Sequence, residues 1–150
     1  MKAVGLFLLA GAALAQAPSF QPVGTMSQLM VNIIYPTSDA IFYVERNVPK
    51  NDAEWEALQN QALMLAESGN LLMMPSRARD QENWMKDSKL LVDVGQAAFK
   101  AAKAKDLQGI LALNQQLNDA CVTCHVQYRP AYGRRRQQNG NDAPAPGATK

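Results

Sequence analysis

The sequence predicts an all-α fold, namely an antiparallel up-down-up-down four-helix bundle. Apolar residues recur at steps of three and four in four long stretches, and Gly, Pro, Asn and Asp separate these stretches. No stretch sustains the alternation of apolar and polar residues that a half-buried strand requires. With 150 residues the chain suits one domain, and short links between long amphipathic helices favour antiparallel neighbours.

Residues 1–15 are expected to be a signal peptide that is cleaved on export to the periplasm. Lys2 gives a positive start, Val4–Leu14 is an apolar run, and Ala13–Ala15 has the small-x-small pattern of a cleavage site. A membrane span needs about 20 apolar residues, so we expect none here. An uncleaved helix is the alternative, although no other charge occurs before Asp39.

The rest of the chain divides into an N-terminal lead at 16–23, the four-helix domain at 24–136 and a disordered tail at 137–150. The whole chain has 15 basic and 13 acidic residues, a balance that gives no general attraction to nucleic acid. Its one basic cluster, Arg134–Arg136, is expected to end a helix that runs into the tail. A docking patch for an acidic partner is the alternative for this cluster.

The first helix is predicted from about Gly24 to Asn47. Pro36 lies inside the pattern and lacks a backbone N–H, so it should kink or divide the helix near Tyr35. Pro49 follows the end of the element. The residues that share the apolar face are Met26, Met30, Ile33, Thr37, Ile41 and Val44.

Three further helices follow. The second starts at Asn51, where Asn51 and Glu54 have capping-box spacing. Gly69–Asn70 could end or weaken it, the alternative being one more turn over Leu71–Met74 before Pro75. The third is predicted over about Asp80–Lys103. The fourth begins with Asp106 as its cap and runs past Tyr128.

The aromatic side chains on these helices have expected roles in packing. Trp55 and Trp84 should pack in the core of the bundle with their indole N–H groups near the surface. Tyr128 should pack beside the pocket at Cys121–His125.

One pentapeptide, Cys121-Val122-Thr123-Cys124-His125, holds both cysteines and the single histidine of the chain. The C-x-x-C-H pattern is the signature of c-type haem attachment. On a helix Cys121 and Cys124 lie one turn apart, so both thiols can reach the two vinyl groups of one haem. His125 is then able to direct an imidazole nitrogen at the iron. The sequence therefore predicts one covalently attached haem c, with its iron, near the C-terminal end of the last helix.

Three other uses of this motif are alternatives to haem attachment. A redox-active C-x-x-C usually lies on a βαβ unit, and no strand is predicted. A zinc site needs a fourth ligand, but the chain has no other Cys or His. A structural disulfide suits an exported protein, yet it would join residues within one helical turn and leave His125 without a role.

The position of the motif also carries a family resemblance. The string from Cys121 to Arg129 stands near the end of the last helix, and the last methionine, Met85, precedes it. In both respects the chain resembles the class II c-type cytochromes, the cytochrome c prime family, over roughly residues 24–132. The resemblance implies that Cys121 and Cys124 are the thioether residues and that His125 is the proximal iron ligand. It also places Arg129 one turn beyond His125, where it could contact a haem propionate, a solvated arginine being the alternative.

The resemblance further implies that the first helix supplies the other side of the haem. Met30 lies at the expected level, and Met26, one turn earlier, is the reserve. A thioether opposite His125 would make the iron low-spin and suit it to electron transfer. In five-coordinate members an apolar residue stands here instead, a part that Leu29 or Ile33 could play. Many members also carry an arginine where this chain has Met26, so its distal side departs from the gas-binding pattern.

The predicted function is that of a periplasmic electron carrier that exchanges electrons with redox partner proteins. The alternative is a five-coordinate haem protein that binds nitric oxide or carbon monoxide, and a plain disulfide protein is a second rival. No arrangement for substrate turnover is visible, so no enzymatic activity is expected. The resemblance allows a homodimer, although nothing in the sequence requires one.

Overall fold

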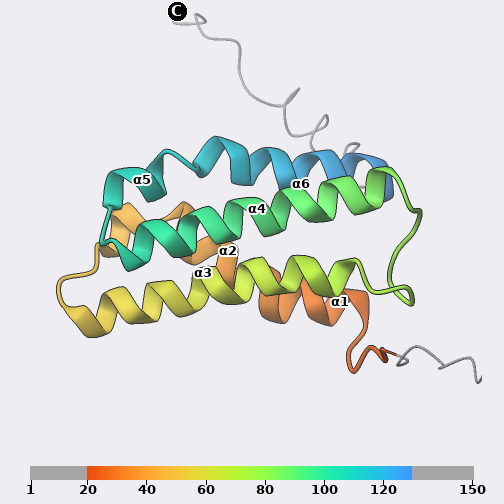
Figure 1. Ribbon diagram of the computed structural model, residues 1–150, viewed down its shortest axis with the longest axis horizontal. Coiled ribbons are helices and arrows are strands. Elements are labelled where there is room, and N and C mark those ends of the chain that lie inside the picture. The colour runs from red at the N-terminus through yellow and green to blue at the C-terminus, as the bar shows by residue number, and fades with distance from the viewer. Residues whose placement is uncertain (1–19, 130–150) are drawn as a thin grey trace, which may run out of the picture.

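The computed structural model describes residues 20–129 as four helical segments and no strand (Figure 1). The predicted signal peptide (1–15), most of the lead and the predicted tail (137–150) lie outside the described residues. The elements in chain order are α1 (Met26–Leu29), η1 (Met30–Ile34), α2 (Tyr35–Phe42), η2 (Val44–Asn47), α3 (Asp52–Leu72), α4 (Asn83–Lys103), α5 (Leu107–Leu111) and α6 (Asn114–Tyr128). The predicted all-α class is therefore confirmed for this part of the chain.

The first segment contains the break that Pro36 predicts. Thr25 caps α1 by accepting the N–H of Gln28, and the Gln28 side chain accepts the N–H of Thr25 in return. The helix then widens into the π turn η1, in which the N–H of Tyr35 donates to the carbonyl of Met30. A proline ring clashes with the carbonyl four residues earlier in a regular α-helix, so the wider turn before Pro36 relieves that clash.

The second segment, α3, begins as predicted and continues past Gly69–Asn70. Asn51 accepts the N–H of Glu54 at the N-terminus, while the Glu54 carboxylate accepts the N–H of Lys50. Of the two alternatives at Gly69–Asn70, an end there is wrong and a continuation is confirmed, because α3 continues to Leu72.

Two glycines explain how α3 continues and packs tightly on α4. A Cβ added at Gly69 would lie 2.6 Å from Cγ2 of Val92, and one added at Gly95 would lie 2.6 Å from the backbone nitrogen of Ala66. Neither distance is tolerable, so each helix presents a glycine where the other approaches. Gly69 therefore serves helix packing rather than helix termination.

The third and fourth segments differ from the prediction at their starts and interiors. Asp80 accepts the N–H groups of Glu82 and Trp84, so it closes a turn ahead of α4 and the helix starts at Asn83. Asp106 caps the last segment by accepting the N–H of Gly109. That segment is divided between α5 and α6 at Ala112–Leu113, a break that the apolar pattern does not predict.

The core lies between the four segments. Its fully buried large side chains come from all four of them: Ile41, Leu65, Val94, Ile110 and Leu117. None of the helices in the described range has the length and apolarity needed to cross a membrane.

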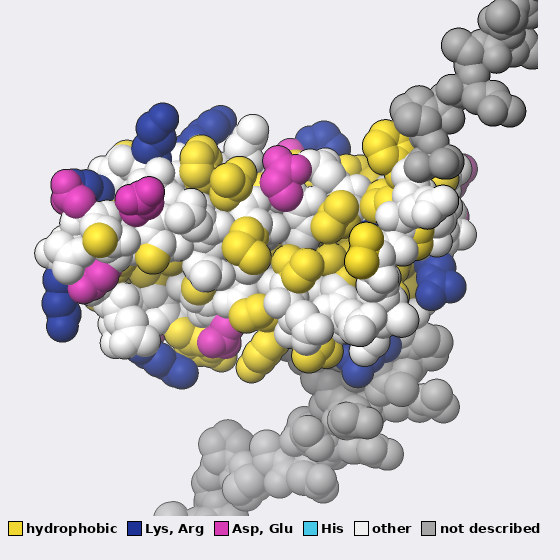
Figure 2. Space-filling model, turned by 90° about the horizontal axis from the view of Figure 1, so that it is seen from below, with side chains coloured by type: hydrophobic (Ala, Val, Ile, Leu, Met, Phe, Trp, Pro, Cys, Tyr) yellow, Lys and Arg dark blue, Asp and Glu magenta, His cyan; other side chains and the backbone are white. Residues whose placement is uncertain are grey.

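The face that carries α1 and α3 also exposes apolar side chains. Figure 2 views the molecule from the side of these elements and shows hydrophobic side chains gathered over this face. The large apolar residues exposed on the first two segments, called here the apolar face, are Val31, Tyr35, Tyr43, Leu63, Met64 and Leu71.

Candidate functional site

A cavity of about 300 Å³ lies where α1 begins and α6 ends, at the same end of the bundle (Figure 1). We refer to it as the outer cavity. One wall is formed by Met26, Met30 and Val31 of the first segment, and the facing wall by Cys124 and His125 of α6. Its other lining residues are Ser27, Arg79, Trp84, Tyr128 and Arg129.

A smaller space of about 40 Å³, the inner recess, adjoins the outer cavity. Met30, Cys124 and His125 line both spaces, and Cys121 lines the inner recess. Apolar side chains form most of the remaining wall of the recess: Ile34, Leu72, Leu91 and Ala120. All three reactive residues of the pentapeptide therefore line one apolar region at a single end of the bundle.

The helical geometry of α6 explains this convergence. Cys121 and Cys124 lie three residues apart on the helix and so share a face, and His125 follows on the same turn. Both thiols are free, with Cys121 half-buried and Cys124 only 8 % exposed.

The surroundings set the protonation states of these residues. Burial, followed by the charges of Asp87 and Cys121, raises the pKa of Cys124 to about 11, and burial also raises the pKa of Cys121. Burial and then the nearby Arg129 guanidinium lower the pKa of His125. At neutral pH the thiols are therefore protonated and the imidazole is uncharged, which is the form that binds a metal.

The residues proposed for the position opposite His125 differ in whether they line the site. Met30 and Met26 both line the outer cavity, and Met30 also reaches the inner recess. Leu29 and Ile33 line neither space. They line a different hollow, together with Phe20, Leu71, Met74 and Arg77. The two methionines are thus brought to His125, and the two apolar alternatives are not.

The loop between α3 and α4 contributes a residue that sequence reasoning did not identify. Arg79 is exposed and lines the outer cavity beside Arg129, so two guanidinium groups lie at its rim. Arg129 follows the predicted motif, but Arg79 lies 50 residues away from it in sequence. Only the folded loop brings them to one cavity, and no local spacing signals it.

A polar network joins this loop to the walls of the cavity. The hydroxyl of Tyr128 donates to Oδ2 of Asp80, and the Trp84 ring packs edge-on against the Tyr128 ring with 4.9 Å between centroids. The indole N–H of Trp84 donates to the carbonyl of Leu72 at 2.8 Å inside the protein. The expectation that this N–H lies near the surface is therefore wrong, because the end of α3 provides a buried acceptor.

A second unpredicted feature is the buried carboxyl group of Asp87 on α4. It lines the inner recess, is 4 % exposed, and its Oδ2 makes no hydrogen bond within the described part of the chain. Burial raises the pKa of Asp87, and the Oγ of the neighbouring Ser88 is also buried without a partner there. Burying such groups is costly, so the recess has a polar side that the described chain does not satisfy.

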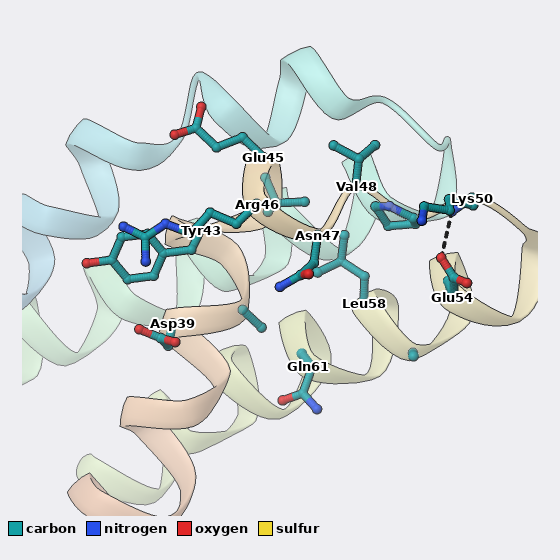
Figure 3. A pocket seen from close by; sticks show the side chains of 14 residues that line it. Asp39, Tyr43, Glu45, Arg46, Asn47, Val48, Lys50, Glu54, Leu58 and Gln61 are labelled. Carbon is teal, nitrogen blue, oxygen red and sulfur yellow. Dashed lines mark hydrogen bonds between the residues drawn. The ribbon is translucent and has the colours of Figure 1, made fainter.

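The other end of the bundle has a larger hollow of about 750 Å³, at the connection between α2 and α3 (Figure 3). The Arg46 guanidinium lies 3.9 Å from the centre of the Tyr43 ring, and the N–H of Lys50 donates to Glu54. No Cys or His lines this hollow. Because the residues with metal-binding and nucleophilic chemistry are at the opposite end, the outer cavity and inner recess form the candidate site.

Among residues 20–129 no group of three or more His, Cys, Asp and Glu residues is placed to hold a metal ion. Comparisons of the chain with family models, with curated proteins and with solved structures found no significant match to any of them.

Proposed function

We propose that this chain is a periplasmic mono-haem c-type cytochrome that carries electrons, with His125 and Met30 as the axial ligands of the iron. The observation that carries the proposal is the convergence of Cys121, Cys124 and His125 on one apolar region that Met30 faces. The resemblance of the Cys121–Arg129 string to the cytochrome c prime family supports it. Within that family the proposal favours the Met-ligated, low-spin branch.

The residues of the site fit a haem in three respects. Two free thiols one turn apart line the region where the vinyl groups would be joined. An uncharged imidazole lies beside them, with a thioether on the facing wall. The guanidinium groups of Arg79 and Arg129 lie at the rim, where they would pair with the two propionates.

When bound, the haem supplies an iron that changes between the ferric and ferrous states by one electron. The chain would hold it by thioether bonds from Cys121 and Cys124, and His125 and Met30 would set its spin state and raise its reduction potential. The apolar lining of the inner recess excludes water from the cofactor. Leu29 and Ile33, the residues named for the five-coordinate gas-binding alternative, line a different hollow, and this favours Met30 in the proposal.

The arrangement and partners complete the proposal. We take the four helices to alternate in direction as an up-down-up-down bundle, because short loops join them and α3 packs along α4. Redox proteins would be the partners, and neither nucleic acid binding nor enzymatic turnover is part of the function. Pairing of two copies would use the apolar face of Figure 2.

The proposal is tested by exporting the full chain in cells that have haem-attachment machinery. The mature protein should gain the mass of one haem, keep its haem stain on a denaturing gel and show a low-spin ferric spectrum. The variants Cys121→Ser and Cys124→Ser test the attachment, because each should lose one thioether bond and the double variant should lose covalent haem altogether. A native chain without added porphyrin mass would refute the proposal.

A further inference from the structure

We propose that Arg77, in the loop of residues 73–82, is a positioning residue that keeps the Met30 wall of the site close to the His125 wall. This inference rests on the proposed function, since it concerns how firmly Met30 can hold a sixth position. It assigns a role to a side chain outside the site itself.

The contacts of Arg77 are its first support. Its Nη2 donates to the carbonyl of Gly24 at 3.1 Å, and its Nη1 lies 3.4 Å from the carbonyl of Leu71 and 3.3 Å from Sδ of Met74. The contact with Gly24 joins residues 53 positions apart and touches the chain directly before Thr25, the cap of α1. A half-buried guanidinium with this many partners has one fixed placement.

The same loop is also attached to the opposite wall. Asp80 accepts the hydroxyl hydrogen of Tyr128, which belongs to α6 three residues after His125. Asp80 is itself held by the N–H groups of Glu82 and Trp84. One loop therefore binds the start of the Met30 wall through Arg77 and the end of the His125 wall through Asp80.

The first wall benefits from such an attachment because Met30 lies close to the start of its helical segment. Only the four residues of α1 lie between the cap and the π turn that begins at Met30. Helix ends open more readily than helix interiors, and the bond from Arg77 fixes this end to the loop of residues 73–82. An iron–thioether bond tolerates little displacement, so loosening this turn would increase the population in which Met30 is detached.

The experiment uses the full holoprotein with Arg77→Ala, Arg77→Lys and the control Arg46→Ala. Arg46 is an exposed arginine at the other end of the bundle, where it lies over Tyr43. The readouts are the ferric spin-state spectrum and the rate at which carbon monoxide binds the ferrous form. That rate rises in proportion to the population with Met30 detached.

Arg77→Ala should show a high-spin component and bind carbon monoxide about tenfold faster, a factor typical of losing one charge-assisted hydrogen bond. Arg77→Lys keeps a charged donor for Gly24 and should fall between Arg77→Ala and the native chain. Arg46→Ala should match the native chain. Ile110→Val, a core change away from the site, should lower the melting temperature without changing either readout.

Three results would overturn the inference, and they differ from one another. If the native protein is low-spin and Arg77→Ala matches it in both readouts, the role of Arg77 is refuted while the proposed function stands. If the native haem protein is high-spin, Met30 is not a ligand, and the inference fails although haem attachment survives. If the native chain carries no haem, the proposed function and the inference fail together.

Discussion

At the scale of single residues, burial shifts the pKa values of the site residues away from the ordinary values of their residue types. Cys124 keeps its proton because it is buried near Asp87, and His125 loses its proton because it is buried near Arg129. Both shifts arise from the end of α6 packing against α4. If the same two thiols and imidazole lay on an exposed helix, the thiols would be more reactive and the imidazole would be partly charged.

The first prediction separates the two methionines of the outer cavity. Met30→Ala should convert the ferric haem protein from low-spin to high-spin and lower its reduction potential, because Met30, unlike Met26, lines both spaces of the site. Met26→Ala is the matched control and should keep the low-spin spectrum. Absorption spectra of both variants decide the matter, and the reverse pattern would make Met26 the ligand.

The second prediction concerns the pH dependence of stability through Asp80 and Tyr128. The hydrogen bond between them lowers the pKa of Asp80, while burial and that bond raise the pKa of Tyr128 to about 12. The stabilisation from Asp80 is present above its ordinary pKa and is lost as the pH falls through the lowered value. The stabilisation from Tyr128 is present below its ordinary pKa and is lost as the pH rises through about 12.

Tyr128→Phe removes this bond and keeps the ring that packs on Trp84. Its melting temperature should be below that of the native chain near neutral pH, and the difference should shrink at both extremes of pH. Thermal melts across the pH range measure this difference. A constant difference would show that the bond makes no titratable contribution. Tyr35→Phe, at an exposed tyrosine of the apolar face, is the control and should change little.

At the scale of elements, the starts of α1, α3 and α5 each depend on a polar capping side chain, and the α3–α4 pair depends on glycine. Gly69 and Gly95 stand where the facing helix comes within reach of a Cβ. This close packing buries backbone atoms of both α3 and α4 along their contact. The pair is therefore the element that a small increase in side-chain size should disturb most.

Gly95→Ala should accordingly lower the free energy of unfolding by about 1–3 kcal/mol, because the added methyl group meets backbone atoms of Ala66 rather than a flexible side-chain end. Gly24→Ala is the control, since its added methyl would find an ordinary 3.4 Å contact with Gln28. Urea unfolding curves of the two variants measure the change. Equal stability of Gly95→Ala and the native chain would contradict the packing argument.

The helix ends show what the sequence can and cannot predict. Asn51 and Asp106 were predicted as caps because their side chains act on backbone N–H groups a few residues away. Pro36 predicted its break for the same local reason. The sequence left the effect of Gly69 open between helix end and continuation, because its role depends on Val92 of another helix, which no local pattern displays.

At the scale of the whole molecule, the same distinction applies to the candidate site. The pentapeptide and the level of Met30 follow from helical periodicity, so the sequence predicts them. Arg77, Arg79 and Asp80 are placed by a loop that returns across the end of the bundle, and Asp87 by the packing of α4 on α6. Such long-range placements have no signature in the spacing of residues along the chain.

The whole-molecule prediction concerns the apolar face of Figure 2. Val31 and Tyr35 are 61 % and 66 % exposed, and covering them with a second copy would bury apolar surface. We expect sedimentation to give twice the mass of one chain, and the change Tyr35→Asp to shift it toward a single chain. Val126→Asp, at an exposed valine of α6, should leave the dimer intact. A native chain that sediments alone would refute the pairing.

The burial of Cys124 has a consequence for biosynthesis. In the closed bundle this residue is only 8 % exposed and its thiol has a pKa of about 11, so the thiol is a poor nucleophile and difficult for an enzyme to reach. A lyase that joins a porphyrin to this sulfur would have to act while the newly secreted polypeptide is still open. Premature collapse of the bundle would then compete with maturation, and the yield of the finished cytochrome would depend on which process is faster.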